Sequence, residues 1–289
     1  MSAAVAACDR PTELMRCLDA ILAGEAPPAE IIVVDQSRDT HVADALAAIP
    51  EHATPVRYVR QPRRGLSASR NAALALASQD MVAFTDDDCV PSGGWIATVH
   101  RVLAGDTAIA GVTGRVLPLG EKRAGTYVVS PRTSTDPCVY RGRAVPWTVG
   151  TGGNFAARRD WLTRVGGFDE RLGAGSPGRA AEDAELLYRL LLAGAAIRYE
   201  PASLVYHERQ TAAQRLASRT GYGHGIGALC ALYLRKGDAY AGVMLASYLR
   251  GHGVGLARAV LHRDWFMARQ RLLALGGCAS GLRHGWGMR

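Results

Sequence analysis

Short apolar runs and amphipathic segments alternate along the first 85 residues. The apolar runs have the length and composition of buried strands, and they span residues 5–8, 30–35, 55–59 and 81–84. Between them, apolar residues recur at the 3.6-residue spacing of a helix, over residues 14–22, 42–48 and 66–77. This alternation of strands and helices predicts an α/β fold with a doubly wound sheet.

The pattern is less regular in the next part of the chain. The same signals predict a helix at 95–103, a strand at 108–116, a helix at 182–191, and extended segments at 196–201 and 203–206. Residues 118–145 show no period and contain several prolines. We therefore expect a long irregular loop there, of the kind that acts as a lid or a mobile segment.

Acidic side chains follow two of the predicted strands. Asp35 ends the second strand, and Asp86, Asp87 and Asp88 follow the fourth. In an open α/β sheet, ligands bind at the carboxyl ends of the strands, and alternate carboxylates can share a hard divalent cation with phosphate oxygens. The pattern indicates Mg²⁺ or Mn²⁺ with a nucleotide diphosphate. An acidic surface turn without a ligand is the alternative for the triplet, and a turn or helix-capping role is the alternative for Asp35.

Arginines gather at the start of the helix predicted at 66–77. Arg63 and Arg64 precede this helix and Arg70 lies within it. Arginines beside a helix start suit a phosphate clamp. Salt bridges on the surface would explain the same cluster.

Three further features have both a functional and a structural explanation. Gly152-Gly153 permits close approach of a ligand, or simply a tight backbone contact. Glu182-Asp183 opens a helix, where acids stabilise the helix dipole or point into a cleft as a base. His207 directly follows an extended segment and could reach the acid-lined edge, although a lone histidine is usually not a ligand.

Composition limits the class of protein. The chain has 289 residues and 48% hydrophobic content, enough for one large domain or a domain with an appendage. Its six cysteines lack C-x-x-C or zinc spacing, so we expect reduced thiols in a cytosolic protein without a structural metal. The N-terminus lacks the basic region of a signal peptide, and the longest run without charged residues is too short to span a membrane.

The net charge of +8 is concentrated in residues 211–289, which hold eleven basic residues and two aspartates. This asymmetry indicates an anionic surface, either membrane or nucleic acid, or only a solvated basic face. Arginines are interleaved there with apolar runs at 226–234, 243–249 and 272–275. We expect amphipathic helices that dock on the inner face of the cell membrane, without nucleic acid. Packing of these faces on the rest of the chain, or in a homodimer, is the alternative.

Eight segments, taken in order, resemble the motifs of glycosyltransferase family 2, the inverting nucleotide-sugar transferases with the GT-A fold. They are Asp9-Arg10-Pro11, 31–35, 65–71, 84–91, 152–155, 166–170, Glu182-Asp183 and 201–208. The resemblance implies a GT-A type mixed sheet with a Rossmann-like nucleotide-binding half over residues 1–210, followed by a basic helical region over 211–289. The first strand departs from the family, because it is rich in alanine and Ala7-Cys8 replaces the usual Thr or Pro.

The resemblance also assigns roles to individual residues. It implies that Asp183 is the catalytic base, that Asp35 binds the base or ribose, and that Arg70 binds the diphosphate. The implied metal ligands are Asp86, Asp88 and His207. The residues implied in binding the nucleotide sugar are Asp9, Arg10, Asp35, Arg63, Arg70, Asp86, Asp87, Gly153, Asn154 and Glu182.

The implied reaction is a single displacement. Asp183 would remove the proton from an acceptor hydroxyl, which attacks the anomeric carbon as the nucleoside diphosphate leaves, so the configuration inverts. We expect a hexosyl- or deoxyhexosyltransferase that uses a glycan or lipid-linked acceptor in cell-surface glycan or glycolipid assembly. We also expect it to be non-processive, because the sequence has neither spanning helices nor a Gln-x-x-Arg-Trp motif.

Two other functions explain part of the pattern. An aspartyl-phosphate phosphatase also has Asp-x-Asp after an apolar strand, but its chemistry needs a lysine near the phosphate, and this chain has only Lys122 and Lys236. A non-catalytic nucleotide-sugar-binding or scaffold protein would keep the binding residues without turnover. Release of nucleoside diphosphate would distinguish the transferase from both.

Overall fold

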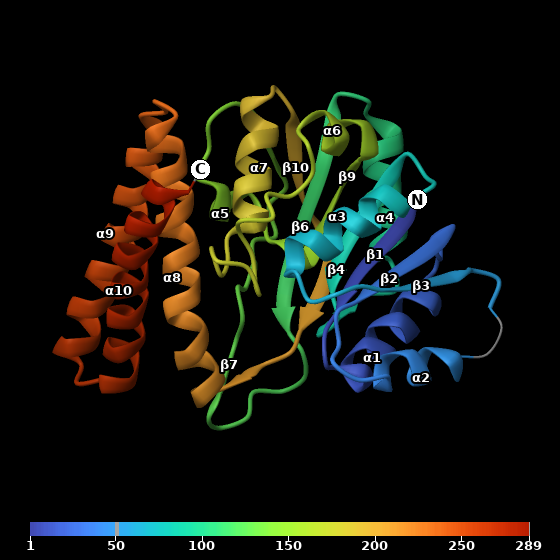
Figure 1. Ribbon diagram of the computed structural model, residues 1–289, viewed down its shortest axis with the longest axis horizontal. Coiled ribbons are helices and arrows are strands. Elements are labelled where there is room, and N and C mark those ends of the chain that lie inside the picture. Colours follow the sequence, from blue (N-terminus) through green and yellow to red (C-terminus); the bar gives the residue numbers. More distant parts are fainter. Residues whose placement is uncertain (50–51, 289) are drawn as a thin grey trace.

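A mixed β-sheet forms the centre of the structure (Figure 1). The computed structural model describes residues 1–49 and 52–288. In this part of the chain the strand order is β3-β2-β1-β4-β9-β6-β10-β5, with β8 also paired to β10. The first half of the sheet is parallel and consists of β3 (Val56–Arg60), β2 (Glu30–Asp35), β1 (Ser2–Ala7) and β4 (Met81–Asp86).

The second half of the sheet changes direction at β9, which runs antiparallel to both of its neighbours. β6 and β10 are parallel to each other, whereas β5 and β8 pair antiparallel with β10. The strands of this half are β9 (Phe155–Arg158), β6 (Ile109–Pro118), β10 (Ala196–His207), β5 (Cys89–Pro91) and β8 (Cys138–Tyr140). A separate small sheet pairs β7 (Thr126–Tyr127) with β11 (Gln210–Thr211).

Helices cover both faces of the sheet. One core contains residues of α1, α2 and α4, and the other contains residues of α3, α6 and α7. Ile31 and Val33 of β2 enter the first core, and Ile32 and Val34 enter the second. Burial on both sides explains why this strand reads as an unbroken apolar run. The helices are α1 (Pro11–Leu22), α2 (His41–Ala47), α3 (Leu66–Leu76), α4 (Trp95–Gly105), α5 (Pro146–Val149), η1 (Gly152–Asn154), α6 (Arg159–Arg164) and α7 (Glu182–Leu192).

The predicted alternation of strands and helices and the predicted mixed sheet are both confirmed. β1 begins at Ser2, earlier than the predicted residue 5. β5, β9, α5 and α6 were not predicted, because elements of three to six residues are too short to show a period.

Two predicted segments differ from the structure. The extended segments predicted at 196–201 and 203–206 form one strand, β10, whose register with β6 shifts between Glu200 and Leu204. Pro201 lies within this shift, where its lack of an N–H breaks no ladder hydrogen bond. Residues 118–145 are largely irregular as predicted, but they contain β7 and β8, and Arg132 bridges to β6. The predicted loop is therefore tied to the sheet at several points, and its role as a lid stays a prediction.

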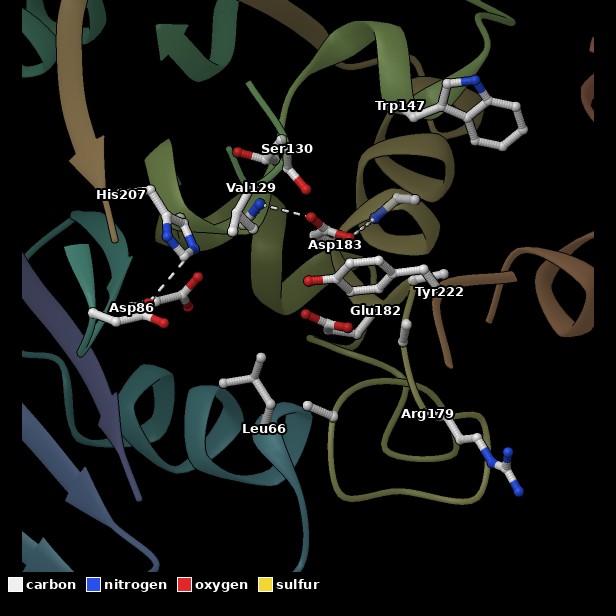
Figure 2. A pocket seen from close by; sticks show the side chains of 18 of the residues that line it. Leu66, Asp86, Val129, Ser130, Trp147, Arg179, Glu182, Asp183, His207 and Tyr222 are labelled. Carbon is white, nitrogen blue, oxygen red and sulfur yellow. Dashed lines mark hydrogen bonds and ion pairs between the residues drawn. The ribbon is translucent and has the colours of Figure 1, made fainter. Parts of the chain in front are cut away.

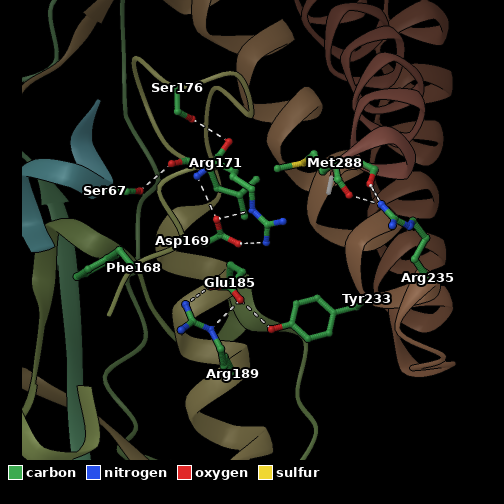
Figure 3. Close-up of polar contacts among 12 residues, drawn as sticks. Ser67, Phe168, Asp169, Arg171, Ser176, Glu185, Arg189, Tyr233, Arg235 and Met288 are labelled. Carbon is green, nitrogen blue, oxygen red and sulfur yellow. Dashed lines mark hydrogen bonds and ion pairs between the residues drawn. The ribbon is translucent and has the colours of Figure 1, made fainter. Parts of the chain in front are cut away.

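Three long helices follow the sheet and stand side by side next to α7 in Figure 1. They are α8 (Ala212–Arg235), α9 (Tyr240–Leu261) and α10 (Trp265–Gly287). Tyr188 of α7 shares an apolar cluster with Leu229 and Met244, and the hydroxyl of Tyr233 donates to the Glu185 carboxylate at 2.8 Å (Figure 3). The division into 1–210 and 211–289 stays a prediction, since this shared cluster joins the two parts.

Glycines bring the backbones of α8 and α10 into contact. A Cβ on Gly227 would overlap the carbonyl oxygen of Cys278, and a Cβ on Gly281 would overlap that of His224. A four-residue spacing keeps such residues on one face of each helix, as in small-xxx-small packing. The same close approach occurs at 223 and 227 in α8 and at 277, 281 and 285 in α10.

This packing corrects one expectation for residues 211–289. The apolar run at 226–234 was expected to enter a membrane surface, but Leu229 and Cys230 are fully buried inside the protein. Exposed apolar side chains lie elsewhere, on α9 and α10. Among the residues described, no helix is both long enough and apolar enough to cross a membrane.

We predict that Gly227→Ala lowers the free energy of unfolding by about 1–3 kcal/mol, because the added methyl group must push α8 away from α10. Gly242→Ala in α9 is the matched control, since a Cβ there meets nothing within 4 Å. Gly242→Ala should raise the free energy of unfolding by about 0.5–1 kcal/mol, because alanine has the higher helix propensity. Equal stability of the two variants in chemical denaturation would contradict the close packing.

Candidate active site

The predicted acidic triplet lies at the end of β4, in the middle of the sheet. Asp86 is the last residue of β4, and Asp87 and Asp88 form the turn into β5. β5 pairs with the end of β10 in a register that sets His207 opposite Cys89. As a result, Nε2 of His207 lies 3.5 Å from Oδ1 of Asp88. Strand pairing therefore brings the histidine to the acids.

The donor atoms at this turn fit a divalent cation. Asp86, Asp88, Cys89 and His207 each offer one ligand atom, and these atoms all lie within 4.8 Å of one another. Nδ1 of His207 lies 2.9 Å from the carbonyl oxygen of Glu208, so a proton on Nδ1 leaves Nε2 free as a ligand. Burial raises the pKa of the Cys89 thiol well above its usual value, and hard cations prefer the neighbouring carboxylates to sulfur. The two carboxylates and the imidazole are donors that fit Mg²⁺ or Mn²⁺.

Arg70 of α3 joins the acidic turn to the start of α7. Its side chain is only 3% exposed. Nη2 donates to Oδ1 of Asp86 at 2.6 Å, and Nη1 donates to Oε1 of Glu182 at 2.9 Å. The guanidinium also lies over the ring of Phe168, 5.3 Å from its centroid. Arg70 thus organises two carboxylates of the cleft, and its implied contact with a diphosphate stays a prediction.

Two glycines allow this arrangement. A Cβ on Gly152 would lie 2.7 Å from the Arg70 guanidinium nitrogens, and a Cβ on Gly153 would lie 3.1 Å from Oδ2 of Asp86. Gly153 is held there by the hydroxyl of Thr85, which donates to its carbonyl oxygen at 2.9 Å. The glycine pair therefore lets the backbone lie against the charged groups.

Asp183 and Glu182 open α7 after Ala181, which has the left-handed φ of 70°. Both oxygens of Asp183 accept backbone hydrogen bonds, one from the N–H of Gly152 and one from that of Ala184, each at 2.7 Å. These bonds fix the direction of the carboxylate in the cleft. Burial, and next the neighbouring Asp183, raise the pKa of Glu182 to about 7. The two adjacent acids therefore lie in different environments.

A second arginine contacts the acidic turn from the end of β1. Nη1 of Arg10 lies 3.0 Å from Oδ1 of Asp87 and 2.7 Å from Oδ2 of Asp88. Oδ2 of Asp87 also accepts from the N–H of Cys8 at 3.1 Å. Burial raises the pKa of Asp87 to about 7 despite the attraction of Arg10. This buried acid positions the turn.

Asp9 and Arg63 form an exposed ion pair beside this turn. Nη2 of Arg63 lies 2.5 Å from Oδ2 of Asp9, and the other Asp9 oxygen accepts from the N–H of Arg38 at 3.0 Å. The Arg38 hydrogen bond is the largest cause that lowers the pKa of Asp9. Arg63 borders the cleft, whereas Asp9 supports it from outside.

Asp35 and Asn154 lie beneath the cleft rather than on its wall. Asp35 is fully buried and accepts from the hydroxyl of Tyr58 at 2.9 Å and the N–H of Ser37 at 2.8 Å. The amide of Asn154 makes four hydrogen bonds, with partners in Trp95, Arg115 and Ser203. These contacts use all of its hydrogen-bonding capacity on the protein itself. The implied ligand contacts of both residues stay predictions.

The cleft has a volume of about 900 Å³. Figure 2 shows Asp86 and His207 on one side and Glu182 and Asp183 in the middle, with the ring of Tyr222 of α8 beside these two acids. The predicted residues that line the cleft are Arg10, Arg63, Arg70, Asp86, Asp87, Asp88, Gly153, Glu182, Asp183 and His207. The last three helices complete the wall with residues that sequence reasoning missed, including Arg219, Tyr222, Tyr248, His252 and Arg271. Of these residues, Tyr222 is marked in the sequence by the glycines on either side of it, Gly221 and Gly223.

Relatives of known class share the first part of the chain. Residues 1–221 match the family described as Glycosyltransferase like family 2. A pre-mycofactocin glycosyltransferase of Mycobacterium tuberculosis is 32% identical over 207 residues, which cover 68% of this chain and 42% of the relative. The succinoglycan biosynthesis protein ExoM of Rhizobium meliloti is 27% identical over 227 residues, covering 74% and 69%. This chain therefore spans less than half the length of the mycobacterial relative.

Solved structures agree with the fold. The mannosyltransferase PcManGT of Pyrobaculum calidifontis, in complex with GDP-Man and Mn²⁺, matches with a TM-score of 0.65 and 18% identity, over 97% of this chain and 86% of that one. GalNAc-T7 with UDP, GalNAc and Mn²⁺ matches with a TM-score of 0.54 and 20% identity, over 72% and 43%. These likenesses confirm the predicted GT-A fold.

Proposed function

The chain belongs to glycosyltransferase family 2, and we propose that it transfers a hexosyl or deoxyhexosyl group from a nucleotide-diphosphate sugar to an acceptor hydroxyl with inversion. The observation that carries this proposal is the meeting of three elements in one cleft. The end of β4 supplies Asp86 and Asp88, the end of β10 supplies His207, and the start of α7 supplies Asp183. A cation site and a base therefore face the same space.

In the proposed reaction Asp183 is the base. Its carboxylate is held by two backbone N–H groups and takes the proton of the acceptor hydroxyl. The acceptor oxygen then bonds to the anomeric carbon while the bond from that carbon to the diphosphate breaks, and the nucleoside diphosphate leaves with the bonding electrons. Arg10 and Arg63 border the cleft beside the acidic turn, where their charges would favour the leaving diphosphate.

We propose that Asp86, Asp88 and His207 hold Mg²⁺ or Mn²⁺. The donor set supports this assignment, and both solved structures described above contain Mn²⁺. A bound cation would supply positive charge to the departing diphosphate. Without it, the acidic turn would repel the phosphates of the donor.

We propose non-processive transfer to a glycan or a lipid-linked acceptor, in glycan or glycolipid assembly. The sequence contains no Gln-x-x-Arg-Trp motif, and the names of the relatives include both pre-mycofactocin and succinoglycan, so they do not define one acceptor. An aspartyl-phosphate phosphatase is disfavoured because neither Lys122 nor Lys236 lines the cleft.

We predict that Asp88→Ala abolishes the Mn²⁺-dependent binding of nucleotide sugars but preserves the fold, since this acid lies in a turn outside the cores. Melting temperatures across a panel of nucleotide sugars, with Mn²⁺ or with chelator, would measure the effect. A ligand at 100 times its Kd adds about 2.7 kcal/mol to wild-type stability. Asp80→Ala, whose side chain is 96% exposed, is the control. If Mn²⁺ and the nucleotide sugar stabilise the Asp88 variant as much as wild type, the proposed cation site is wrong.

For Asp183→Asn, we expect turnover to fall by about 10²- to 10⁴-fold with donor affinity nearly unchanged, because the amide cannot take the acceptor proton. The amide oxygen can accept from only one side, so one of the two N–H groups that hold Asp183 loses its partner. A loss of about 1–3 kcal/mol in stability should accompany the change. Nucleoside diphosphate release and thermal unfolding would be measured beside Asp80→Asn. Near-normal turnover would show that Asp183 is not the base and serves only to stabilise the start of α7.

We also propose that the turn between α9 and α10 docks on an anionic membrane. Val260, Leu261 and Trp265 are exposed at this turn, next to Arg258 and Arg263 in the sequence. Tryptophan and arginine together favour the headgroup region of anionic lipids.

The position of this turn fits delivery of a lipid-linked acceptor. The ring of Phe266, the residue after Trp265, lies 4.8 Å from that of Tyr127 in β7, and β7 pairs with β11 just beyond the end of β10. In Figure 1 the start of α8 and β7 lie at the end of the molecule toward which β6 and β10 point. A membrane at the turn would therefore lie near the carboxyl edge of the sheet, where the cleft opens.

We predict that the protein co-sediments with phosphatidylglycerol vesicles at low salt and is released at high salt. The double variant Leu261→Ser/Trp265→Ser should bind at least about tenfold more weakly, because it loses the apolar part of the surface. Trp286→Ser removes an equally exposed tryptophan near the other end of α10 and should bind normally. If wild type ignores these vesicles, or if the Trp286 variant loses as much binding as the double variant, the proposed docking turn is wrong.

A further inference from the structure

The wall of the cleft formed by the last three helices is basic. Arg219 and Tyr222 come from α8, Tyr248 and His252 from α9, and Arg271 from α10. They line the same cavity as the acidic turn and Asp183. We call these five residues the arginine wall.

The two arginines of this wall lack an acidic partner among the described residues. The Nε atoms of Arg219 and Arg271 are buried and form no hydrogen bond, and neither side chain has an ion pair within the described part of the chain. The acids of the last three helices are used elsewhere. Asp238 accepts from the hydroxyl of Tyr188, and Asp264 caps α10 through the N–H of Met267. Both arginines are half-buried, and a guanidinium in such a place, with no acid beside it, can donate to a bound anion.

The surrounding side chains hold the arginines in place. A Cβ on Gly255 of α9 would lie 2.8 Å from Nε of Arg271, so glycine leaves the space that this side chain fills. Arg219 lies over the ring of Tyr222, 4.9 Å from its centroid. The rings of Tyr248 and His252 are in contact, tilted by 35° with their centroids 4.3 Å apart. The wall is therefore a packed arrangement.

The electrostatics of the wall favour an anion. Burial, with Arg215 and Arg271 as like charges, lowers the pKa of Arg219 to about 10. Burial and the two arginines lower the pKa of His252 to about 4, so this ring is neutral at pH 7. Arg219 stays charged at that pH in a partly dry site, where an oxyanion would relieve its repulsion with the neighbouring arginines and satisfy its N–H groups.

The place of the wall relative to Asp183 indicates which substrate supplies the anion. In Figure 2 Tyr222 enters the cleft from the side away from Asp86 and His207, and its ring lies beside Asp183 and Glu182. The donor diphosphate would be held at the acidic turn by a cation. An acceptor hydroxyl must reach Asp183 from the opposite side of the anomeric carbon, because inversion requires in-line attack. The arginine wall comes from α8, α9 and α10, which stand beyond α7 from the sheet in Figure 1 and so border the cleft on that opposite side.

We propose that the arginine wall binds an oxyanion on the acceptor, a phosphate or a carboxylate, and so positions the attacking hydroxyl at Asp183. This inference rests on the proposed glycosyl transfer. Arg219 and Arg271 are positioning residues in it, and Tyr222 and Tyr248 form the sides of the subsite. A lipid phosphate and an acidic sugar present the same charged oxygens, and experiment can separate them.

The test is calorimetric titration of the full chain with no donor present, after metal has been removed by chelator and the chelator by dialysis. Under this condition the acidic turn repels anions, and the variants below test whether the binding belongs to the arginine wall. The probes are butyl phosphate and methyl glucuronide, with methyl glucoside as the neutral control. We expect at least one anion to bind and the neutral sugar not to bind. Preference for the phosphate would indicate a phosphorylated acceptor, and preference for the glucuronide an acidic glycan.

Variants then locate the binding. Arg219→Gln and Arg271→Gln should each weaken the favoured anion by about 10- to 100-fold, the usual effect of losing a charge-assisted hydrogen bond. Arg250→Gln, an exposed arginine of α9 outside the cleft, should bind like wild type. Gly255→Ala should also weaken binding, because it displaces the Arg271 side chain while keeping its charge. Thermal unfolding of each variant would show that the fold is kept.

Two results would overturn the proposal. One is failure of the wild type to bind either anion at millimolar concentration, and the other is equal binding by wild type, Arg219→Gln and Arg271→Gln. Neither depends on turnover, since the titration contains no donor and no metal. The titration can therefore fail or succeed independently of the test for glycosyl transfer.

Discussion

The site depends on one buried ion-pair triad, the guanidinium of Arg70 between Asp86 and Glu182. A buried arginine must keep its partners, because removing one partner of such a pair typically costs 3–5 kcal/mol. The triad therefore ties α3, the end of β4 and the start of α7 into one unit. Gly152 is required beside it, since any side chain would collide with the guanidinium. Asp183 follows Glu182 directly, so the same triad places the proposed base in the cleft.

Local patterns in the sequence predicted much of the fold but only part of the site. β2 and β4 were predictable because strands buried on both faces are continuous apolar runs, and the acids at their ends followed from the strand boundaries. His207 was expected to reach the acidic edge, but local patterns could not show that it meets Asp88, because this contact depends on the register of β10 against a three-residue strand. Asn154 shows a different limit, since a buried amide saturated by Trp95 and Ser203 looks the same in sequence as one that binds a ligand.

The last three helices show how composition can mislead. Apolar residues interleaved with arginines suit both a membrane surface and a packed helix layer. Glycine spacing distinguishes the two, because Gly227 and Gly281 face backbone atoms of the neighbouring helix and so pack α8 against α10. The apolar surface left exposed is then confined to α9 and α10, with Leu261 and Trp265 at their turn. Packing, rather than overall hydrophobicity, decides which residues can meet a lipid.

The cleft separates charge in a way that matches two anionic substrates. Its sheet side holds clustered carboxylates at the end of β4, which would repel a diphosphate unless a cation were bound. Its helical side holds Arg219 and Arg271, which need no cation to accept an oxyanion. Tyr222 lies within reach of both groups of charges. Burial is the main reason that its pKa is raised; Arg219 lowers this pKa, and the acids of the sheet side raise it. Binding on the sheet side should therefore depend on the metal, and binding on the helical side should depend on the arginines, with Asp183 between the two.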